Sequence, residues 1–205
     1  MKQPLPISAI KKVFLSLAFL HLAFAGCAQA GLLDRFNANR LHKQKVSMLI
    51  LGSWAAGNIA LGGIAASQTS GEARYFHGMN AGWNLVNLGL ATAGYLAATR
   101  TDPASLGLFE SIEEQHRIQK IFLFNAGLDV GYMAGGAYLM ERARRGGGQA
   151  DRLRGFGKSI ILQGAFLFVF DLGAYLWQAN GNAELQPLLQ GLSFSGQSVG
   201  LKWAF

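Results

Sequence analysis

The stretch YFHGMNAGWNLVNLGLATAG, residues 75–94, decides how this chain folds. No Lys, Arg, Asp or Glu occurs from Tyr75 to Thr99, and this run is long enough to cross a bilayer as a helix. Polar and small residues recur in it at alternating steps of three and four, which places them on one helical face. These residues are His77, Asn80, Asn84, Asn87, Ala91 and Gly94. A helix of membrane length with a polar stripe needs polar groups to face, so we expect neighbouring helices to supply them.

The composition of the whole chain agrees with this interpretation. Of its 205 residues, 51% are hydrophobic and 14% are charged, whereas about 25% are charged in ordinary soluble domains. The charges sit in short blocks between apolar runs of about 20 residues, which is the pattern of transmembrane helices. The formal charge of +7 includes lysines of the N-terminal segment. We therefore expect the lipid bilayer as a partner, and no nucleic acid.

The predicted fold is all-α, an integral membrane four-helix bundle over residues 31–182. A signal segment precedes the bundle at 1–30, and a short amphipathic or strand-like tail follows it at 183–205. The alternation of apolar and other residues at 192–194 and 199–205 favours a strand. The expected membrane spans lie at about 46–66, 75–98, 121–140 and 159–178.

The N-terminal segment allows three interpretations. Lys11 and Lys12 precede an apolar core, and Ala28-Gln29-Ala30 fits cleavage by signal peptidase after Ala30. Alternatively, Cys27 is the lipidated first residue of a lipoprotein, or the segment is retained as an extra helix. Each interpretation places the protein in a bacterial cell envelope, with the inner membrane as the expected site. The terminal alternating residues resemble the closing strand of an outer-membrane barrel, so the outer membrane is the alternative.

A comparison of depths along the four spans predicts a polar cluster in the middle of the membrane. Residues near the midpoints of the spans lie at similar depths, at 1.5 Å of rise per residue, and polar groups avoid hydrocarbon by pointing into the bundle. The predicted cluster contains Asn58, Asn84, Asn87, Asn125, Asp129 and Asp171, and a rim nearer the cytoplasm contains His77, Asn80 and Gln163.

The two aspartates determine which functions we consider. No Lys or Arg occurs in any predicted span, and an unpaired ionised carboxylate at that depth is costly. Either a proton or a cation neutralises Asp129 and Asp171, or asparagine amides stabilise them. The first case predicts a small transporter or channel component with a proton or cation as its partner. The second, which we favour, predicts a non-enzymatic structural or interaction subunit that associates with itself or with other membrane subunits.

Motifs for enzymatic chemistry are missing from the sequence. Cys27 is the only cysteine, and no histidine pair has the spacing of a helical metal site. The glycines 146–148 lack the Lys of a phosphate loop, and no serine stands in a GxSxG context. We therefore expect no catalytic residues, no metal and no cofactor.

Four stretches together resemble a family of small bacterial membrane proteins known only as a domain of unknown function. The resemblance covers most of the chain after residue 40. It implies a bacterial envelope location and four helices, and it supplies no activity. The stretches are YFHGMNAGWNLVNLGLA at 75–91, NAGLDVGY at 125–132, GFGKSIILQGAFLFVFD at 155–171 and GLKWAF at 200–205.

Overall fold

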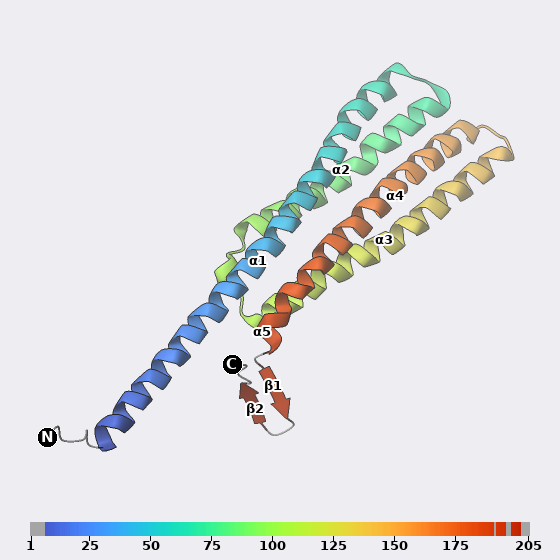
Figure 1. Ribbon diagram of the computed structural model, residues 1–205. Helices are drawn as coiled ribbons and strands as arrows, with labels where there is room; N and C mark the ends of the chain where they lie inside the picture. Colours follow the sequence, from blue (N-terminus) through green and yellow to red (C-terminus); the bar gives the residue numbers. More distant parts are fainter. Residues whose placement is uncertain (1–6, 191, 196–197, 202–205) are drawn as a thin grey trace.

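A bundle of long helices dominates the structure. The computed structural model describes the backbone of residues 7–190, 192–195 and 198–201, and the side chains of residues 30–189. The helices form two hairpins that lie side by side, α1 with α2 and α3 with α4 (Figure 1). Each expected span lies within one of these helices, and each helix is longer than its span. The helices are α1 (Ile7–Gln68), α2 (Gly71–Arg100), α3 (Leu108–Arg144) and α4 (Ala150–Ala179).

The turns of the two hairpins lie at the same end of the bundle, which we call the loop end (Figure 1). Gly71 begins α2 with a φ of 57°, and Gly146 and Gly147 have φ values of 76° and 103° between α3 and α4. Left-handed backbone of this kind favours glycine, because a Cβ atom would clash there. The opposite end, the base end, holds the connection from α2 to α3, where Asp102 caps the short helix η1 (Pro103–Ser105).

The two hairpins meet where α2 packs against α4. A Cβ atom at Gly155 would lie 2.5 Å from the carbonyl oxygen of Glu72, so the two backbones approach closely near the loop end. Lys158 Nζ also lies 2.5 Å from Glu72 Oε1. Within the second hairpin, a Cβ atom at Gly136 would lie 2.7 Å from the carbonyl oxygen of Gly157. Small residues at such contacts are typical of helices packed in membranes.

The N-terminal helix α1 is continuous through the predicted signal segment and the polar stretch that follows it. The predicted lipidation at Cys27 concerns a side chain outside the described part, and cleavage after Ala30 stays a prediction. Near the base end, Phe36 forms a small apolar core with Leu185 and Leu188. These two leucines come from η2 (Asn180–Leu185) and α5 (Gln186–Gln190).

The predicted strand-like tail contains a short antiparallel hairpin. Its strands are β1 (Leu192–Ser195) and β2 (Ser198–Leu201), and Leu192 pairs with Leu201. The last residues of the tail, 202–205, lie outside the described part of the chain.

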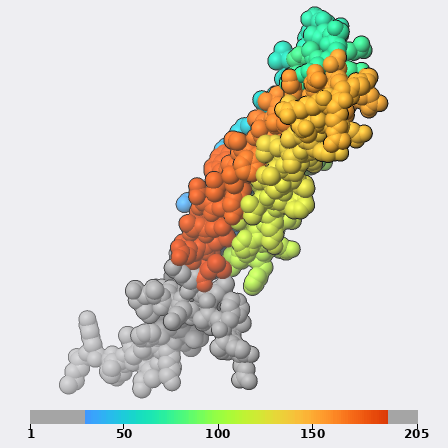
Figure 2. Space-filling model, turned by 90° about the vertical axis from the view of Figure 1, so that its right-hand side faces the viewer, coloured from blue at the N-terminus to red at the C-terminus, as the bar shows by residue number. Residues whose placement is uncertain are grey.

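The outer surface of the bundle carries many large apolar side chains. Figure 2 shows the face that α3 and α4 form along the length of the bundle. Exposed apolar residues occur on all four long helices, among them Leu61, Ile64, Leu85, Val86, Leu90, Leu123, Phe124, Val130, Val169 and Leu176.

Two segments, Ala30–Gln68 and Ala150–Leu189, are long and apolar enough to cross a membrane by length and composition. Core helices of soluble proteins and signal sequences sometimes pass the same test. Only 17% and 33% of the most apolar windows of these segments are buried, which differs from a core helix. The predicted all-helical bundle is confirmed, and insertion in a membrane stays a prediction.

Candidate functional site

A hydrogen-bonded network of amides joins three helices in the loop-end half of the interior. Gln163 of α4 donates from Nε2 to Asn80 Oδ1 of α2 over 3.0 Å and to Asn58 Oδ1 of α1 over 3.3 Å. Gln163 Oε1 accepts from Trp54 Nε1 at 2.9 Å, and the Ser159 hydroxyl donates to Asn80 Oδ1 at 2.6 Å. We call these five residues the amide network. Asn80 and Gln163, predicted at a rim, are therefore at its centre.

Asn84 and Asn87 are buried, but their amides bond within α2. Asn84 Nδ2 donates to the carbonyl oxygen of Asn80 at 2.8 Å, and Asn87 Nδ2 donates to Asn84 Oδ1 at 3.2 Å. Side chains of this length readily reach the backbone one turn earlier. We expected both residues to meet Asp129 and Asp171, but among the described side chains no hydrogen bond joins them to either aspartate.

Asp129 of α3 and Asp171 of α4 form a carboxyl pair in the interior. Their carboxyl groups lie close enough to interact with each other, and Asn125 lies close to Asp171. Only 2% of Asp129 and 5% of Asp171 are exposed. Two ionised carboxylates buried side by side repel each other, so this arrangement favours a proton on one of them. The ion pairs found in the described part of the chain involve neither aspartate.

On α4 an apolar residue, Leu167, separates Gln163 of the amide network from Asp171 of the carboxyl pair. Leu167 lies one helical turn from both Gln163 and Asp171 on the same face of α4, and it packs with Leu51 and Ala91. The single polar cluster that we predicted is therefore divided in two. His77, the remaining rim residue, is half-buried in α2, where its ring contacts Phe76 edge to face.

A third polar group, the base cluster, was missed in the sequence. It contains Asn37 and Arg40 of α1, Gln115 and Gln119 of α3, and Gln178 of α4, all of them buried. Gln115 Nε2 donates to the backbone oxygen of Gln178 at 2.7 Å. The predicted membrane span begins only at about residue 121, so it leaves out the start of α3. The spacing of Ser111, Gln115 and Gln119, four residues apart, was the signal that they share one helical face.

The base cluster contains an arginine in an unusual environment. Arg40 is only 4% exposed, and its NH1 atom lies 3.9 Å from Glu114 Oε2. Burial lowers the pKa of the Arg40 guanidinium, and the nearby charge of Glu114 acts in the opposite direction. Arginine stays protonated despite such shifts. The base cluster therefore places a fixed positive charge at the base end of the interior.

None of these polar groups resembles a metal centre. Among the side chains that the structure describes, no group of three His, Cys, Asp or Glu residues lies close enough to hold a metal ion. The chemistry available in the interior is that of amides, one pair of carboxyl groups and a buried guanidinium.

Comparison with known proteins gives a family. The family of unknown function DUF6992 matches residues 50–172, which is more than half of the chain. The matched segment contains the amide network and the carboxyl pair, together with Gln115 and Gln119 of the base cluster, whereas Asn37, Arg40 and Gln178 lie outside it. No curated protein and no solved structure matches the chain. The predicted resemblance to a family without a known activity is thus confirmed, and the chain belongs to the family of unknown function DUF6992.

Proposed function

We propose that this chain is a non-enzymatic integral membrane protein that serves as a structural or interaction subunit of a bacterial envelope assembly. One observation carries this proposal: polar side chains face the interior of the bundle, and large apolar side chains cover its outer surface. On α2, Asn84 and Asn87 face inward with exposed fractions of 0% and 5%, while Leu85 and Val86 between them are 61% and 64% exposed. Such an arrangement is unfavourable in water and suits hydrocarbon, because apolar surface then needs no burial within the protein.

The interior has the construction expected of a membrane bundle that holds itself together. Hydrogen bonds between helices contribute about 0.6 to 2 kcal/mol each in a membrane, and the amide network supplies them between α1, α2 and α4. The close contact at Gly155 brings α2 and α4 together at the same end. Because the buried polar side chains at that end bond to one another, the apolar outer faces remain available for lipid or for other membrane subunits.

Membrane insertion is tested by extraction and by accessibility. The full chain expressed in bacteria is expected to stay with the membranes after an alkaline carbonate wash. Single cysteines in a Cys27→Ser background then report topology: Ser70→Cys and Gly147→Cys at the loop end label from one side, and Ala104→Cys at the base end labels from the other. Release by carbonate, or equal labelling of all three from both sides, would contradict the proposal.

The structural or interaction role has its own test. Mild detergent extraction followed by native mass spectrometry is expected to show the chain in a complex, either with itself or with other envelope proteins. A chain that remains monomeric across a range of mild detergents, and that no membrane-permeant crosslinker joins to another protein in cells, argues against an assembly subunit.

A second function, a proton or cation site, is favoured by the carboxyl pair. Its two carboxyl groups are buried close together, which favours one proton between them, and Asn125 is an amide that lies close to Asp171. Among the described side chains, Asn84 and Asn87 donate within α2, which favours a proton or a cation over several asparagine amides as the group that neutralises the aspartates. A site that holds one removable proton in a membrane is suited to proton or cation movement.

Chemical labelling of the carboxyl groups and measurements of ion flux test this second function. A hydrophobic carbodiimide reacts with protonated carboxyl groups in apolar surroundings, so it is expected to label Asp129 or Asp171 and to spare the exposed Asp151. In proteoliposomes, the D129N/D171N variant is expected to lose proton or Na⁺ flux that the wild type shows. Equal flux in the two proteins excludes the transport function, and the ion whose flux is lost identifies the cargo.

A further inference from the structure

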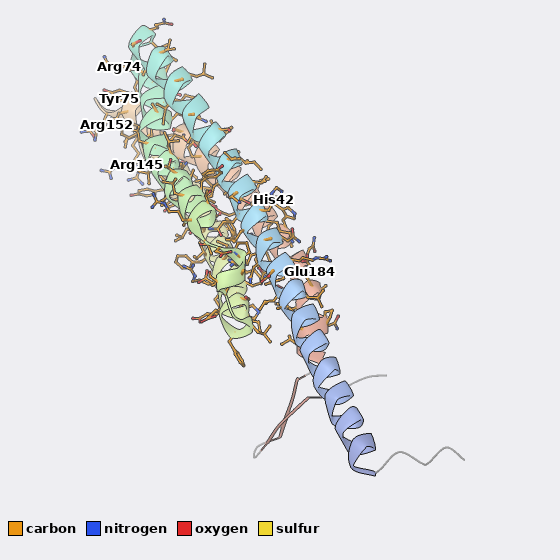
Figure 3. All side chains as sticks on the ribbon, turned by 90° about the vertical axis from the view of Figure 1, so that its left-hand side faces the viewer. His42, Arg74, Tyr75, Arg145, Arg152 and Glu184 are labelled. Atoms are coloured by element: carbon orange, nitrogen blue, oxygen red, sulfur yellow. The ribbon has the colours of Figure 1, made fainter. Side chains whose placement is uncertain are left out.

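A cavity at the loop end is unlike the rest of the bundle surface. It has a volume of about 480 Å³ and lies where α3 turns into α4, between Arg142, Arg145 and the glycines 146–148. Figure 3 shows Arg145 and Arg152 near Arg74 and Tyr75 at this end of the molecule, whereas His42 and Glu184 lie farther toward the base. The cavity therefore opens in the most arginine-rich part of the bundle.

The charges that line the cavity are not balanced. Glu141 is its only lining carboxylate, and Glu141 Oε2 already lies 3.1 Å from Arg144 NH1. Among the described residues, neither Arg142 nor Arg145 forms an ion pair. Two guanidinium groups therefore remain available, and their planar donors match the oxygens of a phosphate group.

The backbone around the cavity also favours an anion. Gly147 leaves the lining without a side chain at a φ of 103°, and a Cβ atom there would meet nothing within 4 Å. The residue before α4, Gln149, makes no side-chain hydrogen bond to the start of the helix. The N–H group of Ala150 donates to the carbonyl oxygen of Gly147 at 3.1 Å, and no side chain caps the following N–H groups of α4 at the positive end of the helix dipole.

The cavity has an apolar side as well. Tyr138 and Leu153 line it, and Tyr138 is 63% exposed on α3. Tyrosine is enriched where a membrane protein crosses from hydrocarbon to headgroups. Since exposed apolar residues continue along α3 from this position, a ligand with both a phosphate and an acyl chain fits the cavity better than free phosphate does.

We propose that this cavity binds the phosphate headgroup of an anionic phospholipid, with Arg142 and Arg145 on the phosphate and Tyr138 against the start of the acyl chains. The inference rests on the proposed membrane location, and it adds a specific lipid site to it. Diffuse attraction of basic residues to an anionic bilayer acts at any arginine near the surface. Binding at a specific site instead depends on the two arginines that line the cavity.

The experiment uses the full chain in nanodiscs of pure phosphatidylcholine, into which phosphatidylglycerol is titrated and its binding measured by native mass spectrometry. The R142Q/R145Q variant is expected to bind phosphatidylglycerol about 100-fold more weakly, since each charge-assisted hydrogen bond from an arginine to the phosphate contributes roughly tenfold. The matched control is R152Q/R154Q, which removes the same charge from exposed positions of α4 that do not line the cavity. This control is expected to weaken binding less than threefold.

The outcomes separate the possible sources of the effect. An equal loss in both variants indicates diffuse attraction and overturns the site, as does equal binding of phosphatidylglycerol and phosphatidylcholine by the wild type. Inorganic phosphate or glycerol phosphate at millimolar concentration is expected not to displace the lipid, and displacement by either would assign the cavity to a soluble phosphate. Failure of the chain to enter phosphatidylcholine nanodiscs instead contradicts the proposed membrane location.

Discussion

The two halves of the bundle interior use similar polar side chains but satisfy them differently. In the loop-end half, the amide network joins three helices, and none of its buried side-chain nitrogen or oxygen atoms lacks a partner. In the part of the interior from the carboxyl pair to the base end, several buried side-chain atoms have no hydrogen-bond partner. Within the described side chains, the buried atoms without a partner are Asn37 Oδ1, Arg40 Nε, Gln115 Oε1, Asp129 Oδ2 and Gln178 Oε1.

This difference indicates different roles for the two halves. An unsatisfied buried polar group costs about 1 to 3 kcal/mol, so a half that served only to hold helices together would be more stable with apolar side chains. In the loop-end half, the hydrogen bonds connect different helices, as expected of a structural role. The base-end half keeps costly polar groups, which favours a role in binding or proton chemistry there.

The largest expected effect comes from separating the hairpins at the loop end. In Gly155→Leu, the new Cβ atom would lie 2.5 Å from the carbonyl oxygen of Glu72 and 2.7 Å from the backbone nitrogen of Phe76. Backbone atoms of a helix cannot move aside singly, so the free energy of unfolding in mild detergent should fall by about 3 kcal/mol. Circular dichroism during denaturation measures it. Gly89→Leu, at an exposed position with nothing within 4 Å, is the control, and an equal loss there would contradict the tight α2–α4 contact.

The next largest effect on stability is expected when Gln163 of the loop-end half is substituted, in comparison with Gln178 of the base-end half. Gln163→Leu removes the three hydrogen bonds that Gln163 makes to Trp54, Asn58 and Asn80, and the loss should be about 2 kcal/mol. Gln178→Leu removes one long hydrogen bond of 3.4 Å and an oxygen without a partner. Its expected change is below about 0.5 kcal/mol in either direction. Denaturation in the same detergent measures both, and similar values for the two variants would remove the distinction between the halves.

A smaller effect, on pH dependence, concerns the carboxyl pair. Because two ionised carboxylates buried side by side are unfavourable, we expect the folded pair to hold a proton that two separate aspartates lose at neutral pH in the unfolded chain. The folded state then binds more protons, so stability should fall as pH rises, by up to about 1.4 kcal/mol per pH unit. Asp171→Asn removes the need for that proton and should flatten the dependence between pH 6 and pH 8. Denaturation midpoints across this range test it, with the exposed Asp151→Asn as control. Parallel curves for wild type and Asp171→Asn would show that the pair holds no proton.

The helices and their inward faces were predictable from the sequence because both follow from one-dimensional patterns. Uncharged runs gave the spans, and steps of three and four gave the faces. On α4 the residues predicted to face the interior, Gln163 and Asp171, are buried. Equal depth also brought Asp129 and Asp171 to the same level, and the structure places them in contact.

Partner choice was not predictable from these patterns. The spacing of a residue fixes its face, but the neighbour depends on how the hairpins pack, and here α2 lies against α4. Asparagine has a further option, because its side chain can bond the preceding turn of its own helix. The base cluster was missed for another reason, because only residues inside the predicted spans were compared in depth, whereas α1 and α3 extend beyond those spans.

The smallest expected effect distinguishes bonds within a helix from bonds between helices. Asn84→Leu combined with Asn87→Leu removes two buried amides, yet both donate only within α2. A bond inside a helix holds no second helix, and leucine stabilises a helix better than asparagine does. The double variant should therefore change the free energy of unfolding by less than about 1 kcal/mol, although its residues are as deeply buried as Gln163. A loss as large as that of Gln163→Leu would mean that burial alone, rather than the helices a hydrogen bond connects, determines which amides hold this bundle together.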